Sequence, residues 1–355
     1  MIGQHNLLHE TRGIARGLAV LAVLGNFGFE RPALAATPDP SGTSAARQTL
    51  AVSVVADERL FTLFAALNVA GYDREINPDG MSETRLAVRA ALADRPLPIL
   101  PVLRLYAGMC QQVRISRCAM YVLHLGPAPD FARVVRGWFV DAPEHSFLGF
   151  DWALREFHRE ADITRLWGQH RPAYEQAVAA YSAVAAPLAE AALHYIRMAS
   201  LQARTVVVIP NLLDTGWVGY GPQIGDTAFV ILGPSSEIET GLVQHELLHS
   251  AINPAIFAAL ENLDSATRAH LEERVDAVDG RQDYHGLEGV VCESIIRALE
   301  IRLAPEAARG ELLAMEASSG FVLVHPFFDG LAGYERSTGA FGEYVPALLQ
   351  SLIAT

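Results

Sequence analysis

The stretch Gln244-His245-Glu246-Leu247-Leu248-His249-Ser250 contains an HExxH motif, with two histidines four residues apart and a glutamate after the first. Positions i and i+4 lie on one face of an α-helix, so His245 and His249 can reach the same point in space. Neutral imidazole binds Zn²⁺, and three protein ligands leave one position for water. Glu246 lies close enough to accept a proton from that water. The spacing therefore predicts a zinc-bearing helix with a general base beside the metal.

The residues around the motif indicate that this helix is buried. The flanking positions are apolar, whereas a chance match would more often lie on a charged surface helix. The alternative is a pair of unrelated histidines with a solvated glutamate. The apolar flanking residues are Leu242, Val243, Leu247, Leu248 and Ala251.

Both ends of the motif helix carry sequence signals. Ser235 or Ser236 can cap its N-terminus, with Glu237 and Glu239 opposing the helix dipole in the first turn. Asn253-Pro254 predicts a stop, because the residue before a proline is pushed away from helical angles. We therefore expect the helix to lie between these signals.

A catalytic zinc site needs a third protein ligand, and a histidine-only site is excluded. The three-histidine pattern of metzincins would need glycine and histidine where this chain has Ile252 and Ala255. A downstream carboxylate is the remaining option. Glu272 with Asp276 is one candidate, but its surroundings read as a solvated helix face.

Glu293 is the stronger candidate for the third ligand. It lies in Gly289-Val290-Val291-Cys292-Glu293-Ser294-Ile295-Ile296, where nearly every neighbour is apolar. A lone carboxylate is costly to bury there unless a cation or a hydrogen-bond donor meets it, and Zn²⁺ meets that need. The alternative is an ion pair within the helix between Glu293 and Arg297. We expect His245, His249 and Glu293 to bind the metal.

Composition excludes several other function classes. The formal net charge of −13 and the pI near 5.4 argue against a nucleic-acid or anionic-membrane surface. The chain has no lysine, so all 27 fixed basic side chains are arginines. Without lysine the chain cannot carry a Schiff-base lysine, a phosphate-loop lysine or a kinase lysine. We therefore do not expect nucleotide-dependent chemistry.

The N-terminus has the pattern of an export signal. Arg12 and Arg16 precede an apolar run over residues 17–29, and Ala33-Leu34-Ala35 fits a cleavage site before Ala36. The alternative is a short anchor that is never cut. We expect residues 1–35 to be a signal peptide, the mature protein to be periplasmic or extracellular, and no further segment to be long and apolar enough to span a membrane.

The three cysteines fit an exported protein without requiring a disulfide. Cys110 and Cys118 could pair in an oxidising compartment, or all three thiols could stay reduced. Cys292 lies in an apolar helical stretch and is interpreted as a small core residue rather than a nucleophile.

The distribution of elements predicts an α+β fold, mostly helical with a small sheet. Residues 36–200 read as a mostly helical region that begins with one strand, and residues 201–355 as the metal-binding catalytic region. Residues 205–210 and 227–232 read as strands joined by a glycine-bearing loop, with the motif helix next. We expect the strand at 227–232 to be a sheet edge beside that helix, where it could hold an extended peptide.

The motif residues also resemble a known group of proteins. His245, Glu246, His249 and the downstream Glu293 are similar to the gluzincins, zinc metallopeptidases with two histidine ligands and one glutamate ligand. More narrowly, the segments at 245–254, 283–286 and 293–302 resemble a family of exported bacterial zincin-like proteins of unknown function. The resemblance implies a zincin-like fold with Glu246 as base. It departs from better-studied gluzincins at Arg297, where an acidic residue is expected.

These observations lead to the hypothesis of a zinc metallopeptidase that acts on a peptide or protein substrate. The alternatives are an exported zinc-site protein that binds a ligand or partner without turnover, and a cysteine hydrolase that uses Cys292. A serine hydrolase is disfavoured because no G-x-S-x-G occurs. The donor for the oxyanion stays open among Tyr220, Tyr284, His285 and Tyr334.

Overall fold

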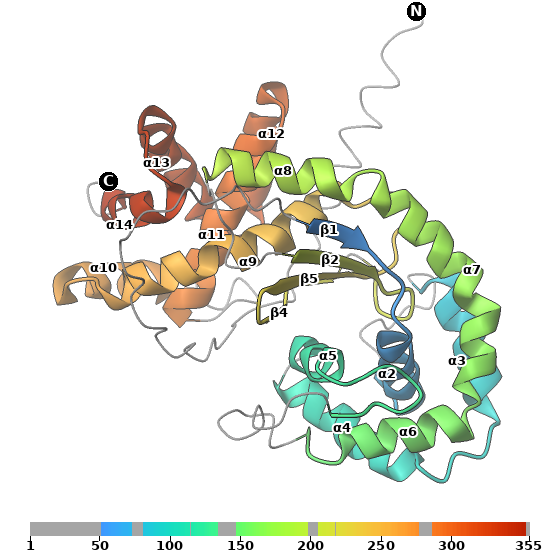
Figure 1. Ribbon diagram of the computed structural model, residues 1–355. Coiled ribbons are helices and arrows are strands. Elements are labelled where there is room, and N and C mark those ends of the chain that lie inside the picture. Colours follow the sequence, from blue (N-terminus) through green and yellow to red (C-terminus); the bar gives the residue numbers. More distant parts are fainter. Residues whose placement is uncertain are drawn as a thin grey trace, which may run out of the picture. The chain divides into compact units, whose positions relative to one another are not determined.

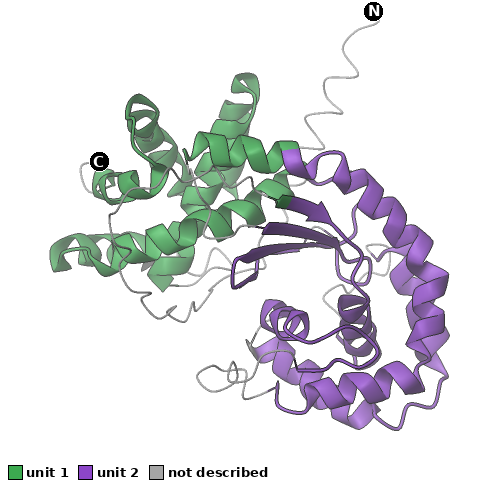
Figure 2. Ribbon diagram, viewed as in Figure 1, with its two compact units in different colours: residues 1–51, 187–204, 240–355 green, residues 52–186, 205–239 purple. Residues whose placement is uncertain are grey.

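The computed structural model describes residues 51–72, 81–113, 115–133, 147–197, 205–216, 218–276 and 286–352. The expected signal peptide lies outside this range. The chain forms two compact units, shown in Figure 2: unit 1 comprises residues 1–51, 187–204 and 240–355, and unit 2 comprises residues 52–186 and 205–239. Both units take residues from either side of residue 200, where the sequence places a boundary.

Unit 2 is built around helix α2, Glu58–Val69, which is buried along most of its length. Asp57 caps this helix by accepting hydrogen bonds from the backbone amides of Arg59 and Leu60. Its neighbours are α3, α4, α5, α6 and α7. These helices span Glu83–Ala93, Leu100–Val113, Ile115–Leu123, Phe150–Glu160 and Ile163–Ser182.

The sheet contains five strands in the order β1-β2-β5-β3, with β4 also paired to β5 (Figure 1). β2 and β5 are the two strands expected from the sequence, and they pair in parallel from Thr205↔Thr227 to Pro210↔Leu232. β3 and β4 are two-residue strands within the glycine-bearing loop. The strand bounds are Ala51–Val54, Thr205–Pro210, Gly219–Tyr220, Gln223–Ile224 and Thr227–Leu232. The predicted α+β class is confirmed: the fold is mostly helical with a small mixed sheet.

The prediction that residues 227–232 form a sheet edge is wrong. β5 pairs with β2 on one side and with β3 and β4 on the other, both antiparallel. The glycine-bearing loop folds back because Gly225 adopts a left-handed φ of 59°, which glycine tolerates without strain. The backbone of β5 is therefore not free to hold an extended peptide along its length.

A disulfide joins Cys110 of α4 to Cys118 of α5. Of the two states left open by the sequence, the structure has the oxidised one. The Cα atoms lie 5.8 Å apart, within the range that a disulfide spans without backbone movement.

One segment in the described part of the chain is long and apolar enough to cross a membrane by length and composition. It is Ile163–Tyr195, a run of 33 residues that contains an 18-residue window with a mean hydropathy of 1.2, so by length and composition alone it departs from the expectation of no further segment of this kind. It comprises α7 and α8, Ala185–Tyr195. Its exposed positions carry polar or small residues, and it buries Ile163, Leu166, Tyr174 and Tyr181. That distribution is typical of an amphipathic helix on a folded domain.

Unit 1 is helical and centres on helix α11, Gly286–Leu303, which contacts α9, α10, α12 and α13. α11 buries nearly all of its residues, as its apolar sequence predicts. Helix α9 carries the motif and also contacts α14. The remaining bounds are Thr240–Glu261 for α9, Ser265–Asp276 for α10, Glu306–Ser318 for α12, Val324–Arg336 for α13 and Phe341–Ser351 for α14.

Both predicted ends of the motif helix are wrong. α9 begins at Thr240, and Ser235 instead donates to the Glu239 carboxylate before the helix starts. The helix continues through Pro254 to Glu261. A proline inside a helix removes one backbone hydrogen bond, but here Ile256 and Leu260 beyond it are buried. Burial of this apolar last part offsets the local cost.

Candidate metal centre

Two helices of unit 1 bring the three predicted ligands together. His245 and His249 lie one turn apart on α9, and Glu293 faces them from α11. The two Nε2 atoms are 3.1 Å apart, and Oε2 of Glu293 lies 3.6 Å from Nε2 of His245 and 3.3 Å from that of His249. These three residues, here called the metal centre, are all buried and can hold a metal ion.

The distances suit a small tetrahedral cation. Zinc–nitrogen and zinc–oxygen bonds of about 2.0 to 2.2 Å place neighbouring donors about 3.3 Å apart in a tetrahedron. The three donor pairs of the metal centre, at 3.1 to 3.6 Å, match that spacing. The donor set of two imidazoles and one carboxylate also fits the ion chemically.

Each histidine has a hydrogen-bond partner on the nitrogen that faces away from the centre. Nδ1 of His245 lies 3.1 Å from Oε2 of Glu300, two turns beyond Glu293 on α11. Nδ1 of His249 lies 3.4 Å from Oδ1 and 3.2 Å from Nδ2 of Asn253, one turn further along α9, so the side-chain amide can serve either tautomer of the imidazole. A proton on each Nδ1 leaves the Nε2 lone pair free for a metal, as in histidine–zinc sites in general.

The two carboxylate oxygens of Glu293 face different partners, because Arg297 bonds only one of them. Nε of Arg297 donates to Oε1 of Glu293 at 2.7 Å, whereas Oε2 faces the imidazoles and has no hydrogen-bond donor among the described residues. The ion pair within the helix is therefore present, and it occupies only one oxygen. The metal-ligand and ion-pair interpretations of Glu293 are compatible.

Glu246 is completely buried beside the metal centre. Neither of its carboxylate oxygens has a hydrogen-bond partner in the described part of the chain. A buried, unbonded carboxylate is costly, so such groups are typical of functional sites rather than of stable cores. Glu246 is thus a carboxylate available for chemistry next to His245.

The buried charges of unit 1 do not balance. Among the described residues of this unit, four carboxyl groups are buried but only one guanidinium, that of Arg297, which leaves three negative charges in excess when all are ionised and the histidines are neutral. Burying unpaired charge is expensive, so protons or a cation must offset this excess. A divalent ion between the imidazoles and Glu293 would offset two of these three charges. The carboxyl groups are those of Glu246, Glu293, Glu300 and Glu316.

The same environment shifts the pKa values of the centre in opposite directions. Burial raises the pKa of Glu246 above its ordinary value, although the two histidines oppose this. Burial acts to raise the pKa of Glu293 as well, but Arg297 and His245 hold it well below its usual range. Burial acts to lower the pKa of His245, yet the carboxylates of Glu300 and Glu293 raise it well above the ordinary value. Paired titratable groups with separated pKa values are typical of acid–base sites.

The competing third ligand lies elsewhere. Glu272 is exposed on α10 and pairs with Arg268 one turn earlier, with 3.4 Å between the charged atoms. It is not part of the cluster of donors that includes the two histidines. Glu272 therefore lies on a solvated face of α10, as expected from the sequence around it.

The described candidates for the oxyanion donor already have acceptors. The Tyr334 hydroxyl donates to the carbonyl of Tyr195 at 2.7 Å, and the Tyr220 hydroxyl donates to Asp214 at 2.7 Å in unit 2. Tyr284 and His285 lie outside the described residues. No oxyanion donor is assigned.

Cys292 is a buried free cysteine on α11. Burial, followed by the neighbouring carboxylates of Glu293 and Glu288, raises the pKa of its thiol well above the ordinary value. A thiol that resists ionisation is a poor nucleophile. The interpretation of Cys292 as a core residue holds, and a cysteine hydrolase is disfavoured.

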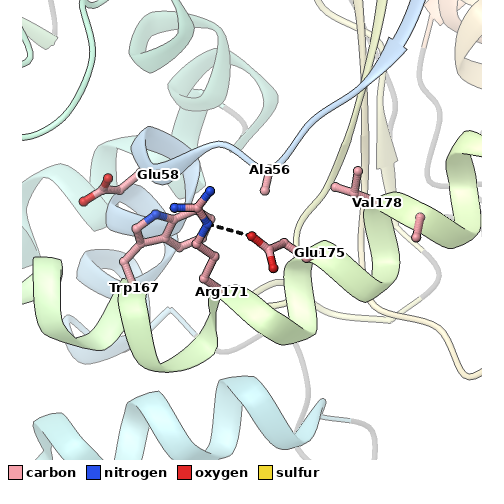
Figure 3. Close-up of a pocket in the computed structure, with 7 residues that line it drawn as sticks. Ala56, Glu58, Trp167, Arg171, Glu175 and Val178 are labelled. Carbon is pink, nitrogen blue, oxygen red and sulfur yellow. Dashed lines mark hydrogen bonds and ion pairs between the residues drawn. The ribbon is translucent and has the colours of Figure 1, made fainter.

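Unit 2 contains a separate open pocket of about 540 Å³ (Figure 3). Trp167, Arg171 and Glu175 project into it from α7, and Glu58 reaches it from the start of α2. Its charged groups are already paired: Arg171 with Glu175 at 2.8 Å, and Glu58 with the buried His158 at 3.0 Å. Every charged side chain in the lining of this pocket therefore has an ion-pair or hydrogen-bond partner.

Three residues around the metal centre were not identified from the sequence: Glu300 and Asn253, which contact the histidines, and Glu316, which contacts Arg297. Glu300 lies seven residues after Glu293, so two helical turns place both on one face. Asn253 lies four residues after His249, where it was interpreted only as a stop signal. Spacing could have revealed both, whereas Glu316 lies on another helix and gave no local signal.

No protein-family model, curated protein or solved structure matches this chain. The resemblance to gluzincins therefore depends on the motif residues and their spacing alone.

Proposed function

We propose that this protein is a zinc-dependent hydrolase that cleaves peptide bonds. The observation that carries the proposal is the convergence of three metal donors on one point, with the unbonded carboxylate of Glu246 next to them. Two imidazoles and one carboxylate form the ligand set of a catalytic zinc site, which leaves a coordination position for water. A zincin-like fold of the gluzincin type is part of the same proposal.

Metal binding and proton transfer are assigned to different residues. His245, His249 and Glu293 hold the ion, which when bound lowers the pKa of a water molecule and polarises the scissile carbonyl. Glu246 accepts a proton from the water and delivers it to the leaving amine. Its raised pKa suits this role, because a base is most effective when its pKa lies near the working pH.

We also propose that the protein acts outside the cytoplasm. The sequence of residues 1–35 has the organisation of an export signal. The Cys110–Cys118 disulfide supports this, since disulfides persist mainly in oxidising compartments. The substrate is expected to be a peptide or protein, in keeping with the absence of any lysine for nucleotide chemistry.

The second candidate function is zinc binding without turnover. The observation that favours it is burial: His245 is 1% exposed and His249 is 5% exposed. A structural zinc site is closed to solvent, whereas a catalytic site keeps an open position that substrate must reach. The two functions therefore differ in whether the fourth position becomes accessible.

A digest of a peptide library tests the proposal. Wild type and Glu246→Gln are compared at equal zinc content, with Glu311→Gln as control because Glu311 is exposed on α12. We expect wild type and the control to cleave peptides, and Glu246→Gln to keep zinc but lose cleavage by about 100-fold or more. Zinc binding without any wild-type cleavage would favour the binding function instead.

A further inference from the structure

The guanidinium of Arg297 is held on three sides inside unit 1. Its Nε donates to Oε1 of Glu293 at 2.7 Å, and its Nη1 donates to both carboxylate oxygens of Glu316 on α12 at 3.1 Å. The ring of Phe321 covers its face, with the guanidinium carbon 3.9 Å from the ring centroid. Arg297 is 1% exposed and Glu316 is 2% exposed. A long side chain with this many contacts has little rotational freedom left.

Two of the three residues that hold Arg297, Glu316 and Phe321, are joined to each other by a backbone hydrogen bond. The backbone amide of Phe321 donates to the carbonyl of Glu316 at 2.9 Å, directly after α12 ends. The Glu316 carboxylate and the Phe321 ring thus approach the guanidinium from the same turn of the chain. The planar fork of arginine suits such bridging between carboxylates, which a lysine ammonium does not reproduce.

This arrangement determines which oxygen of Glu293 reaches the metal centre. With Oε1 bonded to Arg297, only Oε2 is directed at the imidazoles. A carboxylate released from such a bond could rotate and offer both oxygens to one ion. It would then occupy a coordination position that water or substrate needs.

We propose that Arg297 and Glu316 are positioning residues that keep Glu293 a one-oxygen ligand of the metal. Glu316 acts through Arg297, and α12 thereby stabilises a centre built by α9 and α11. This inference rests on the metal-binding part of the proposed function and is independent of whether the site turns over substrate. Residues that orient metal ligands typically change affinity by about 10- to 100-fold when they are replaced.

Cobalt substitution tests the geometry directly, because four-coordinate Co²⁺ absorbs visible light more strongly than five- or six-coordinate Co²⁺. We expect cobalt-loaded wild type to give the intense spectrum and Glu316→Gln to give a weaker, altered one. The zinc Kd of Glu316→Gln should rise by about 10- to 100-fold. Glu311→Gln, the same substitution at an exposed position of α12, should match wild type in both measurements.

Arg297→Lys provides a second test that retains the buried positive charge, and it replaces Glu316→Gln if that variant does not fold. It should show the same weaker spectrum and higher zinc Kd at an unchanged circular dichroism spectrum. A weak spectrum from cobalt-loaded wild type would overturn the inference, as would variants with wild-type Kd and spectrum. A wild type that binds neither ion would instead refute the proposed function, and this inference with it.

Discussion

Nδ1 of His245 on α9 lies 3.1 Å from Oε2 of Glu300 on α11. The pair joins the two helices that build the metal centre, and a proton on this nitrogen would leave the Nε2 lone pair of His245 for a metal. Better-studied gluzincins are expected to carry an acidic residue at the position of Arg297, and Glu300 occupies a different position on the same helix. We propose that Glu300, one turn beyond Arg297, is the carboxylate that orients His245.

Replacing Glu300 should weaken metal binding without abolishing it. Glu300→Gln keeps an acceptor oxygen but loses the charge, and Glu300→Ala loses both, so we expect the zinc Kd to rise in that order. The rise for alanine should reach about 10- to 100-fold. Competition with a zinc-binding dye measures this. Equal affinities in wild type and Glu300→Ala would show that the pair has no orienting role.

The third ligand is tested by a matched pair of alanine variants. Glu293→Ala removes the carboxylate that faces both imidazoles and should lose most of its zinc. Glu272→Ala removes an exposed carboxylate paired with Arg268 and should retain all of it. The zinc content of each variant is measured by metal analysis after dialysis. The reverse result would assign the third ligand to α10.

The buried carboxylate of Glu246 should cost stability in the metal-free protein. Burial raises its pKa above the ordinary 4.5, so the unfolded chain releases this proton at a lower pH than the folded protein does. The folded state therefore loses stability as the pH rises above the unfolded pKa, until the raised pKa is passed. Glu246→Gln, which cannot ionise, escapes this loss.

Urea unfolding of the chelator-treated proteins at about pH 4 and about pH 7 measures the effect. We expect Glu246→Gln to have a higher free energy of unfolding than wild type at the higher pH, with little difference at the lower one. Glu311→Gln serves as the exposed control. A difference that does not change with pH would contradict the assignment of an ionised, buried group.

Metal removal should destabilise the wild type specifically. An ion that binds only the folded state stabilises it by about 2.7 kcal/mol when its free concentration is 100-fold above Kd. A chelator should therefore lower the Tm of wild type, and added zinc should restore it. Glu293→Ala should melt at the same temperature in both conditions. If neither chelator nor added zinc changes the Tm of wild type, metal binding is not coupled to folding.

Much of the metal centre can be predicted from the sequence because its signals are local. The spacing of His245 and His249 depends only on helix geometry, and Glu293 is conspicuous as a carboxylate in an apolar stretch. Glu316 gave no signal, because its contact with Arg297 depends on how α12 packs on α11. Contacts between helices are set by tertiary packing and not by local pattern.

The errors in the fold prediction have similar physical causes. Two-residue strands such as β3 and β4 are too short to show alternation, so the sequence left one side of β5 unpaired. Pro254 predicts a helix stop from local sterics, but burial of the apolar residues beyond it stabilises a continuous helix. Packing outweighs the local preference in both places.

The most direct test of the account is a crystal structure of the zinc-loaded protein with anomalous data at the zinc absorption edge. We predict one strong anomalous peak bounded by Nε2 of His245, Nε2 of His249 and Oε2 of Glu293, at about 2.0 to 2.2 Å from each. An absent peak, or a peak bound by other side chains, would contradict the account.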